Sequence, residues 1–566
     1  MTVSSKAPTS NRSVATLRRS VPSLVAWVVR AAALLSLTAL FIRPGQHVRG
    51  PVQDAVIDGL ALAVTIATAG VMLVLARALA RRKRRAWRVV LAVTVVAALL
   101  YGRVTLWEPF GLNLAIAALL VWTRADFAAE SEPSSRWTAL RAGLLTGGVS
   151  LLAGLALTSR TAPDADSWAV VRETFGALFG FAPDLPFRRP DLRDLTSIAL
   201  NSLGVLTLAV VLLTLLAPRR KPAVLLADDE GRLRELLARH GDDDSLGYFA
   251  LRRDKSAIFS ASGKAAIAYR VVGGVSLASG DPVGDREAWP GAITAWLAEA
   301  ARYAWVPGVL GASRQGASAF VRAGLDALEI GDEAVVDLTS FSLAGREMRS
   351  VRQAVGRVRR AGYTTQVQRQ RELSADDLAE VEQAAHALRD GDVERGFSMA
   401  LGRLGDPADG EAVVVRARDG QGHLVAVLAL VPWGADGLSL DLMRRSRASE
   451  NGTMEFLVAE LAEHAAGLGV RRLSLNFAVF RSALERGGQV GAGPVLRLWR
   501  SVLLWASRWW QIESLYRANA KYDPEWVPRM VCFPRAADLP RVAVAALQAE
   551  AFVVRPRLSR YLRPRR

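Results

Sequence analysis

Hydrophobic and polar residues form three consecutive patterns between Leu438 and Arg481. Leucine occupies every second position over 438–442, which is the two-residue period of a strand. Apolar residues then recur at helical spacing over 454–465, after the helix-start signal Asn451-Gly452-Thr453. A second alternating run follows over 473–477. The stretch therefore predicts a strand, a helix and a second strand.

A helix that joins two strands in this way makes them parallel, and the ends of parallel strands meet at one edge of a sheet. Asp441 and Arg444 lie on the first strand, and Asn476 and Arg481 lie on the second. We therefore predict that these polar side chains surround a site. The alternative is that Asp441 and Arg444 form a surface ion pair.

The same order of elements is predicted twice within residues 222–566, so two copies of one mixed α/β unit are expected. Residues 228–244 are predicted to form a polar helical linker ahead of them. The first copy has strands at 257–259, 265–272, 275–278 and 306–311 and a helix at 288–302. The second copy has strands at 412–417, 424–430, 438–443 and 471–477 and a helix at 453–467.

The first 220 residues contain six apolar runs, several of them close to the roughly 20 residues that a transmembrane helix needs. An α-helical multi-pass membrane domain is therefore predicted. The runs lie near 23–42, 55–79, 86–101, 110–124, 138–159 and 196–217.

Basic residues set the expected orientation of these spans. Arg81-Arg82-Lys83-Arg84-Arg85 follows the second run and Arg219-Arg220-Lys221 follows the sixth. Both termini and the α/β region are therefore expected in the cytoplasm, with the loop 160–195 on the outside. No run carries a row of carboxylates, so an ion pathway is not indicated.

The net charge of +18 suggests an anionic partner, either membrane lipid or nucleic acid. Residues 343–361 concentrate this charge on a predicted amphipathic helix that could lie on the phosphates of RNA or of lipid head groups. The alternative is an ordinary helix with a solvated basic face. The apolar stripe is Met348, Val351, Val355 and Val358, and the basic residues are Arg346, Arg349, Arg352, Arg357, Arg359 and Arg360.

Tryptophan and basic residues are interleaved over 495–529, for example in Arg508-Trp509-Trp510 and in Lys521-Tyr522. This mixture suits a bilayer interface, or a pocket that holds an acyl chain together with a phosphate. A core helix with aromatic side chains is the alternative.

Several kinds of chemistry lack their motifs. The single cysteine, Cys532, excludes an internal disulfide, and the five histidines are scattered, so no metal site is predicted. Nucleotide-binding glycine loops and a nucleophile elbow are absent. Gln353–Val358 matches an acyl-CoA loop only in part and lies within a predicted helix, which disfavours CoA. Direct transfer from an activated ester to a hydroxyl remains, with positioning, a carboxylate and phosphate-binding cations as its requirements.

Five separated motifs resemble the lysylphosphatidylglycerol synthase family, the multiple peptide resistance factors. They are LASGDPVGD, ERGFSMALGRLGDPAD, SLDLMRRS, SLNFAVFRS and LYRANAKYDPEWVPR. The resemblance covers roughly 235–555 and is greatest to the actinobacterial branch, in which this module precedes a lysyl-tRNA synthetase. The membrane region resembles that branch in layout only.

The resemblance implies two tandem acetyltransferase-like (GNAT) subdomains in the α/β region. It also implies transfer of an aminoacyl group from aminoacyl-tRNA to the glycerol hydroxyl of phosphatidylglycerol, with no cofactor beyond that co-substrate. The product is a cationic lipid that blunts attack by cationic peptides. The expected divisions are a tail (1–22), the membrane domain (23–221), a linker (222–245), the first subdomain (246–345), and a basic helix with the second subdomain and C-terminal segment (346–566).

Site residues carry over from the family by motif. Asp441 and Arg444 match its D-x-x-R pair, and Lys521 and Arg529 match its K…P-x-W-x-x-R segment. Asp441 would assist the lipid hydroxyl or bind the aminoacyl ammonium. The expected catalytic residues are Asp441, Arg444 and Lys521, and the expected substrate-binding residues are Glu455, Asn476, Arg529, Arg349 and Arg352.

Two departures from the family qualify the resemblance. The sequence ends at Arg566 without a synthetase domain, so charged tRNA is expected from a separate aminoacyl-tRNA synthetase. The spans are also too few for the family's flippase-plus-synthase layout. Alternatives are another acceptor (peptidoglycan peptide, diacylglycerol or protein) and a non-catalytic membrane protein that binds tRNA or lipid. Lysine follows from the branch resemblance alone, so alanine and arginine stay open.

Overall fold

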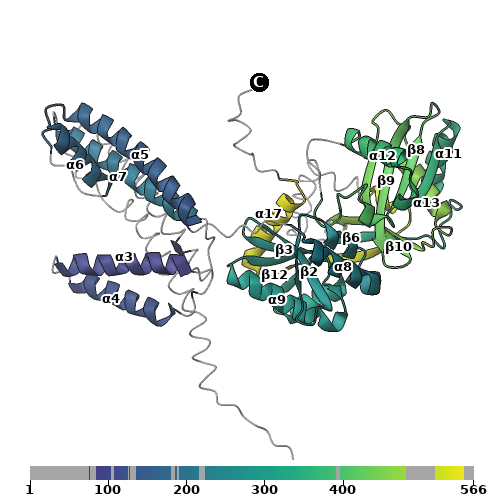
Figure 1. The fold of residues 1–566 in the computed structure, drawn as a ribbon, viewed down its shortest axis with the longest axis horizontal. Coiled ribbons are helices and arrows are strands. Elements are labelled where there is room, and N and C mark those ends of the chain that lie inside the picture. Colours follow the sequence, from purple (N-terminus) through teal and green to yellow (C-terminus); the bar gives the residue numbers. More distant parts are fainter. Residues whose placement is uncertain are drawn as a thin grey trace, which may run out of the picture. The chain divides into compact units, whose positions relative to one another are not determined.

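The chain divides into two compact units, with the main division between Arg220 and Lys221, in a computed structural model (Figure 1). Apart from a few single positions, the structure describes residues 84–103, 107–124, 135–179, 185–187, 190–215, 224–389, 396–479 and 517–553.

The regular elements in the described part of the first unit are all helices. α3 packs against α4, and α5 packs against both α6 and α7. Within the described residues, Trp137–Thr161 of α5 and Leu195–Leu215 of α7 are long and apolar enough to cross a membrane. The helices are α3 (Arg84–Arg103), α4 (Trp107–Trp122), α5 (Ser135–Thr161), α6 (Ser167–Leu178) and α7 (Pro190–Leu215).

Four of the six predicted apolar runs correspond to α3, α4, α5 and α7. The run at 23–42 and nearly all of 55–79 lie outside the described residues. The expected outer loop at 160–195 differs from the structure, because it contains α6. The side chain of Asp166 caps this helix by accepting from the N–H groups of Trp168 and Ala169.

The second unit is built on one 12-stranded sheet in the order β1-β2-β3-β5-β12-β6-β11-β10-β9-β8-β7, with β4 paired to β2. Most neighbouring strands are antiparallel, but β3 is parallel to β5 and β10 is parallel to β11. The strands are β1 (Ser256–Phe259), β2 (Ala265–Val272), β3 (Val275–Ser279), β4 (Val283–Gly284), β5 (Val306–Ala312), β6 (Asp326–Asp337), β7 (Thr364–Arg369), β8 (Val413–Arg418), β9 (Leu424–Trp433), β10 (Gly437–Arg445), β11 (Arg472–Val479) and β12 (Glu525–Phe533).

Helices connect the strands and cover the sheet (Figure 1). Each parallel pair is joined by one helix, α9 for β3 and β5 and α13 for β10 and β11, so the predicted repeat of strand, helix and strand is confirmed. The helices are α8 (Ala227–His240), α9 (Trp289–Arg302), α10 (Arg314–Arg322), α11 (Arg349–Arg360), α12 (Ala375–Ala387), α13 (Thr453–His464) and α17 (Leu539–Ala549).

The structure differs from the predicted divisions at two places. The helix predicted within the linker is present as α8, but this segment is not a free linker, because Leu233 and Leu236 are buried in the core of the first half of the sheet. The expected assignment of 346–566 to the second half also fails at its end. Strand β12 lies between β5 and β6, and α17 packs on β2, β3 and β5. The C-terminal segment therefore completes the first half.

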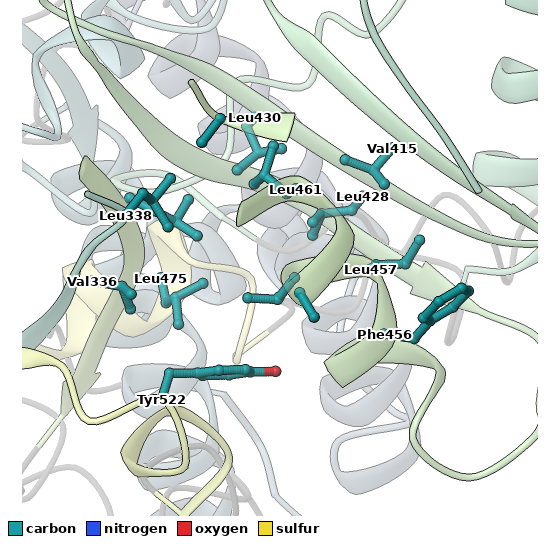
Figure 2. Packing of buried hydrophobic residues seen from close by; sticks show 14 of the residues in the cluster. Val336, Leu338, Val415, Leu428, Leu430, Phe456, Leu457, Leu461, Leu475 and Tyr522 are labelled. Carbon is teal, nitrogen blue, oxygen red and sulfur yellow. The ribbon is translucent and has the colours of Figure 1, made fainter. Parts of the chain in front are cut away.

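A hydrophobic cluster fills the second half between the sheet and two helices. Figure 2 shows Leu428 and Leu430 of β9 facing Leu457 and Leu461 of α13, with Tyr522 at the same cluster. Helix α11 adds the predicted apolar stripe, which is confirmed. Its members Met348, Val351, Val355 and Val358 are all buried.

Candidate active site

Asp441 lies where two parallel strands separate. β10 and β11 are paired only from Gly437–Ser439 to Arg472–Ser474, although both strands continue further. On its other side, β10 shifts register against β9 between Leu440 and Leu442, so Asp441 is the extra residue of a β-bulge. A bulge redirects a side chain and bends its strand. Asp441 therefore lies on a bent part of β10, just beyond the last residue that pairs with β11.

The half-buried Asp441 is fixed by a backbone donor from another part of the chain. The N–H of Leu401 donates to its Oδ1 at 2.5 Å. Arg444, further along β10, is also half-buried.

The segment 396–403, which carries Leu401, is held by side chains of the first half. The carboxylate of Glu550 accepts from the N–H groups of Phe397 at 2.7 Å and Ser398 at 3.0 Å, and from the Ser398 hydroxyl. Arg252 donates to the carbonyl of Ala400 at 2.6 Å. The first half thus positions the donor that fixes Asp441.

Two buried cations lie along the same segment. Arg403 is 5 % exposed. It forms ion pairs with Glu230 at 2.7 Å and with Asp409 at 2.9 Å. Lys255 is fully buried, donates to Ser279 at 2.5 Å, and has its Nζ 4.5 Å from the centre of the Phe397 ring. Burial lowers the pKa of Lys255 to about 7. These contacts give the motif at 394–409 a structural task, which is to connect the two halves.

Lys521 and Glu455 are brought together although they are far apart in the sequence. The Lys521 ammonium lies 2.7 Å from the Glu455 carboxylate, at the first turn of α13. Burial raises the pKa of Glu455, but the hydrogen bond and charge of Lys521 outweigh it and leave that pKa below its usual value. Lys521 is 39 % exposed at its side chain, so a phosphate oxygen has access to it.

Arg529 lies in the interior, which differs from its expected contact with substrate. Its guanidinium pairs with Asp244 at 2.7 Å and with Glu333, and donates to Ser245 at 2.6 Å. Burial opposes its charge, but the surrounding carboxylates raise the pKa of Arg529 further above its usual value. Arg529 therefore ties β12 to β6 and to the segment after α8.

Arg349 and Arg352 are both exposed on α11. Arg352 donates to the carbonyl of Gly345 at 3.0 Å. Arg359, in contrast, pairs with Glu460 and Glu463 of α13 at 2.7 and 2.8 Å. Among the described residues, no carboxylate lies within ion-pairing distance of Arg349 or Arg352, so their charges are available to an anionic partner.

Two predicted features lie beyond what the structure describes. Asn476 belongs to β11, but its side chain is outside the description, as are Arg481 and the aromatic-basic residues up to 516.

An acidic hollow of about 880 Å³, not predicted from the sequence, lies at the opposite ends of the diverging strands. Its carboxylates come from separate segments, so no local motif could have indicated it. They are Asp242, Asp337, Asp436, Asp523 and Glu525, alongside Arg471 and Arg472.

The fold thus combines a helical unit, with two helices long and apolar enough to cross a membrane, and an α/β unit that carries Asp441 where two parallel strands stop pairing. The family described as phosphatidylglycerol lysyltransferase, C-terminal, matches residues 234–533. The family described as the transmembrane region of lysyl-tRNA synthetase matches residues 17–165. The chain belongs to the phosphatidylglycerol lysyltransferase family, as the sequence resemblance indicates.

Curated relatives extend the similarity over most of the chain. It is 47% identical over 520 residues to the lysylphosphatidylglycerol biosynthesis bifunctional protein LysX of Mycobacterium avium (strain 104), covering 87% of this chain and 43% of that protein. LysX of Mycobacterium tuberculosis (strain F11) is 48% identical over 503 residues, covering 86% and 43%. The chain thus spans less than half the length of these relatives.

One solved structure is similar in fold. L-PGS from Bacillus licheniformis aligns with a TM-score of 0.50 and 22% sequence identity, covering 60% of this chain and 99% of that one. At this identity the likeness concerns the fold alone.

Proposed function

We propose that the chain transfers an aminoacyl group, foremost lysyl, from aminoacyl-tRNA to the glycerol hydroxyl of phosphatidylglycerol. The observation that carries the proposal is Asp441 on the bulge of β10, at the point where β10 leaves β11. The match of this unit to the phosphatidylglycerol lysyltransferase family supports the lipid acceptor and the lysyl donor. The tandem GNAT-like character of the two halves is supported by their repeated order of strands and helices.

The reaction forms one ester as it breaks another. The glycerol hydroxyl oxygen attacks the carbonyl carbon of the aminoacyl ester, the bond to the tRNA ribose oxygen breaks, and the hydroxyl proton ends on that ribose oxygen. Asp441 relays this proton or holds the aminoacyl ammonium, and either role requires the ionised carboxylate. The ester is already activated, so no further cofactor is needed, and positioning supplies much of the rate.

Cationic side chains would hold the phosphates of the two substrates. Arg444 and Lys521 are assigned to phosphate near Asp441, while Arg349 and Arg352 on the exposed face of α11 are assigned to tRNA. Arg529 acts indirectly, by fixing β12 in the sheet.

We also propose a multi-pass protein of the cell membrane with both termini in the cytoplasm, where aminoacyl-tRNA is found. The apolar helices α5 and α7 and the basic residues after α7 support this orientation. An aminoacyl-tRNA synthetase is the partner that must supply the ester. The lipid product carries added positive charge, which weakens the attraction of cationic peptides to the membrane.

Lipid mass spectrometry tests the proposed reaction. The full chain is produced in a host that makes phosphatidylglycerol but no aminoacyl lipid, and a new species at the mass of phosphatidylglycerol plus lysyl is expected. Asp441→Asn and Lys521→Met should each lower its amount at least tenfold. Asp376→Asn, at an exposed site in the first turn of α12, is the matched control and should retain it.

Two outcomes would change the assignment. Wild-type amounts of the lipid from both site variants would remove Asp441 and Lys521 from the mechanism. No new lipid from the inserted wild-type chain, with charged tRNA present, would favour another acceptor or a non-catalytic role.

A further inference from the structure

Helix α6 lies beside α5 and α7 but is too short to cross a bilayer. It has 12 residues, which at 1.5 Å per residue is about 18 Å, whereas the hydrocarbon core is about 30 Å thick. It begins at Ser167, only a short turn after α5 ends at Thr161. The chain therefore turns back along α5 without spanning the same distance.

Threonine hydroxyls join the three helices near the end of α5. The hydroxyl of Thr196, at the start of the apolar span of α7, donates to that of Thr161 at 3.2 Å. One turn further in, the hydroxyl of Thr174 donates to that of Thr158 at 3.0 Å, and both residues are fully buried. These contacts satisfy the polar groups internally, as a lipid environment requires.

Close backbone contacts continue towards the middle of the spans. A Cβ atom on Gly204 would lie 1.9 Å from the carbonyl oxygen of Leu178, the last residue of α6. A Cβ atom on Gly154 would lie 2.8 Å from the methyl group of Thr174. Gly204 is near the centre of the apolar stretch Leu195–Leu215. The end of α6 therefore reaches the mid-depth of α7.

The outward face of α6 changes in character along its length. Trp168 (71 % exposed) and Arg172 (67 %) lie near its start, and Phe175 (55 %) and Phe179 (69 %) lie near its end. Their spacing places them on one helical face. Arg172 also pairs with Glu173 at 2.9 Å. Interfacial and charged side chains thus precede purely apolar ones, in the order that a bilayer has from its surface to its centre.

We propose that α6 is a re-entrant helix that enters the bilayer from the side where α5 ends and stops near its middle. A phospholipid is the occupant of its outward face, with the phosphate near Arg172 and an acyl chain along Phe175 and Phe179. Helices α5 and α7, which pack against α6, also expose apolar side chains, for example at Leu152 and Leu206. This inference does not depend on the transferase activity.

Depth measurement in vesicles of phosphatidylcholine and phosphatidylglycerol tests the inference. Single cysteines replace Asp164, Trp168, Phe175 and Phe179 in the full chain and carry a bimane label. Cys532, the one native cysteine, is buried and is replaced by alanine. Lipids with a nitroxide near the head group should quench the label at 168 most. Lipids with a nitroxide deep in the acyl chain should quench the label at 179 most, and aqueous iodide should reach 164 alone.

Three results would overturn the inference. Equal depth at 168 and 179 would mean that α6 lies flat on the surface. Iodide quenching at 179 equal to that at 164 would place α6 in water. Protection of 179 from both lipid nitroxides and iodide would indicate a protein partner on this face.

A packing variant supplies a second measurement with a matched control. Gly204→Val should push the end of α6 away from α7 and make the label at 179 shallower. Gly148→Val on α5, where a Cβ would meet nothing within 4 Å, should leave that depth unchanged. An unchanged depth in Gly204→Val would contradict the seating of α6. The lipid product is assayed separately, so loss of transfer and failure of this geometry are distinguishable.

Discussion

Asp441 reaches its position through residues that lie far from it in the sequence. Its carboxylate is held by the N–H of Leu401, and the segment with Leu401 is held by Glu550 from beyond the residues that match the family. Hydrogen-bond donors of this kind favour the ionised form of a carboxylate, which is the form that the proposed role requires. The precision of the site is therefore set partly by the first half of the sheet.

Glu550→Ala is expected to lower kcat for aminoacyl transfer about tenfold, with KM for phosphatidylglycerol unchanged, because Leu401 loses its fixed position. The same change should cost about 2 kcal/mol of stability, since Glu550 accepts charge-assisted hydrogen bonds. Kinetics and thermal unfolding of the full chain in detergent measure both. Glu235→Ala removes an exposed pair on α8 as a control, and a wild-type kcat in Glu550→Ala would show that Asp441 is positioned otherwise.

Asp281 gives the fold a pH dependence. Burial and the neighbouring carboxylate of Asp244 raise its pKa to about 7, against about 3.9 in an unfolded chain. The folded state therefore keeps a proton that the unfolded state releases, so this contribution to stability is present below pH 4 and is lost as the pH rises to about 7. Asp281→Asn should flatten that decline in Tm. Parallel Tm–pH curves for the variant and the wild type would contradict the assignment.

The part of the arrangement around Asp441 that depends on local sequence patterns could be predicted from the sequence. Asp441 and Arg444 lie in a local alternating pattern, so their strand and its parallel partner could be predicted from the sequence. The partners of these residues could not be predicted, because Leu401 contributes its backbone N–H, and the type of side chain gives no signal for such a contact. Arg529 was misjudged for the opposite reason. The sequence motif does not show that Arg529 is buried beside the carboxylates of Asp244 and Glu333.

At the scale of elements, α11 and α13 meet at a contact that needs glycine. Gly452 caps α13 with a φ of 106°, and a Cβ atom there would lie 2.8 Å from the Cβ of Ala354 on α11. The first turn of α13 carries Glu455, the partner of Lys521. The approach of the basic helix therefore also sets the position of this ion pair.

Gly452→Ala is expected to destabilise the protein by about 1–3 kcal/mol, because it combines backbone strain with a clash between helices. Gly356→Ala on the same basic helix, where a Cβ meets nothing within 4 Å, should instead be neutral or stabilise by about 0.5–1 kcal/mol. Denaturant unfolding compares the two. Equal effects would show that α11 yields to the added methyl group.

Periodicity predicted the elements better than their partners. β2 matches its expected range of 265–272 and α9 begins within one residue of its prediction, because one face of each is buried against a core. Strand β12 was not among the predicted strands, and its place between β5 and β6 depends on packing and not on the pattern within the strand. Helix α6 was not predicted within the expected outer loop, because few residues of this helix are buried, namely Val170, Thr174 and Ala177.

At the scale of the whole molecule, the two halves share one sheet, and β12, which follows the second half in the sequence, belongs to the first half. β12 pairs with β5 along one side and with β6 along the other. Arg529 adds buried ion pairs to this connection. The halves are therefore not independent folding units, although their order of elements repeats.

A protease site inserted within 480–516 tests this connection. After cleavage, the C-terminal fragment with β12 and α17 should remain bound to the rest of the chain through gel filtration in detergent, because two strand ladders hold it. Cleavage at a site placed after residue 553 serves as the control and should release only the tail. Separation of the fragment would mean that the pairing of β12 with β5 and β6 contributes little to holding the two parts of the chain together.

The late place of β12 in the sequence has a consequence during synthesis of the chain. The ribosome makes β1 to β6 first, and the place between β5 and β6 stays unfilled until β12 emerges after the entire second half. Open strand edges invite pairing with other chains. The nascent protein therefore passes through an interval in which chaperones have an exposed edge to protect, and that interval closes only when β12 has been made.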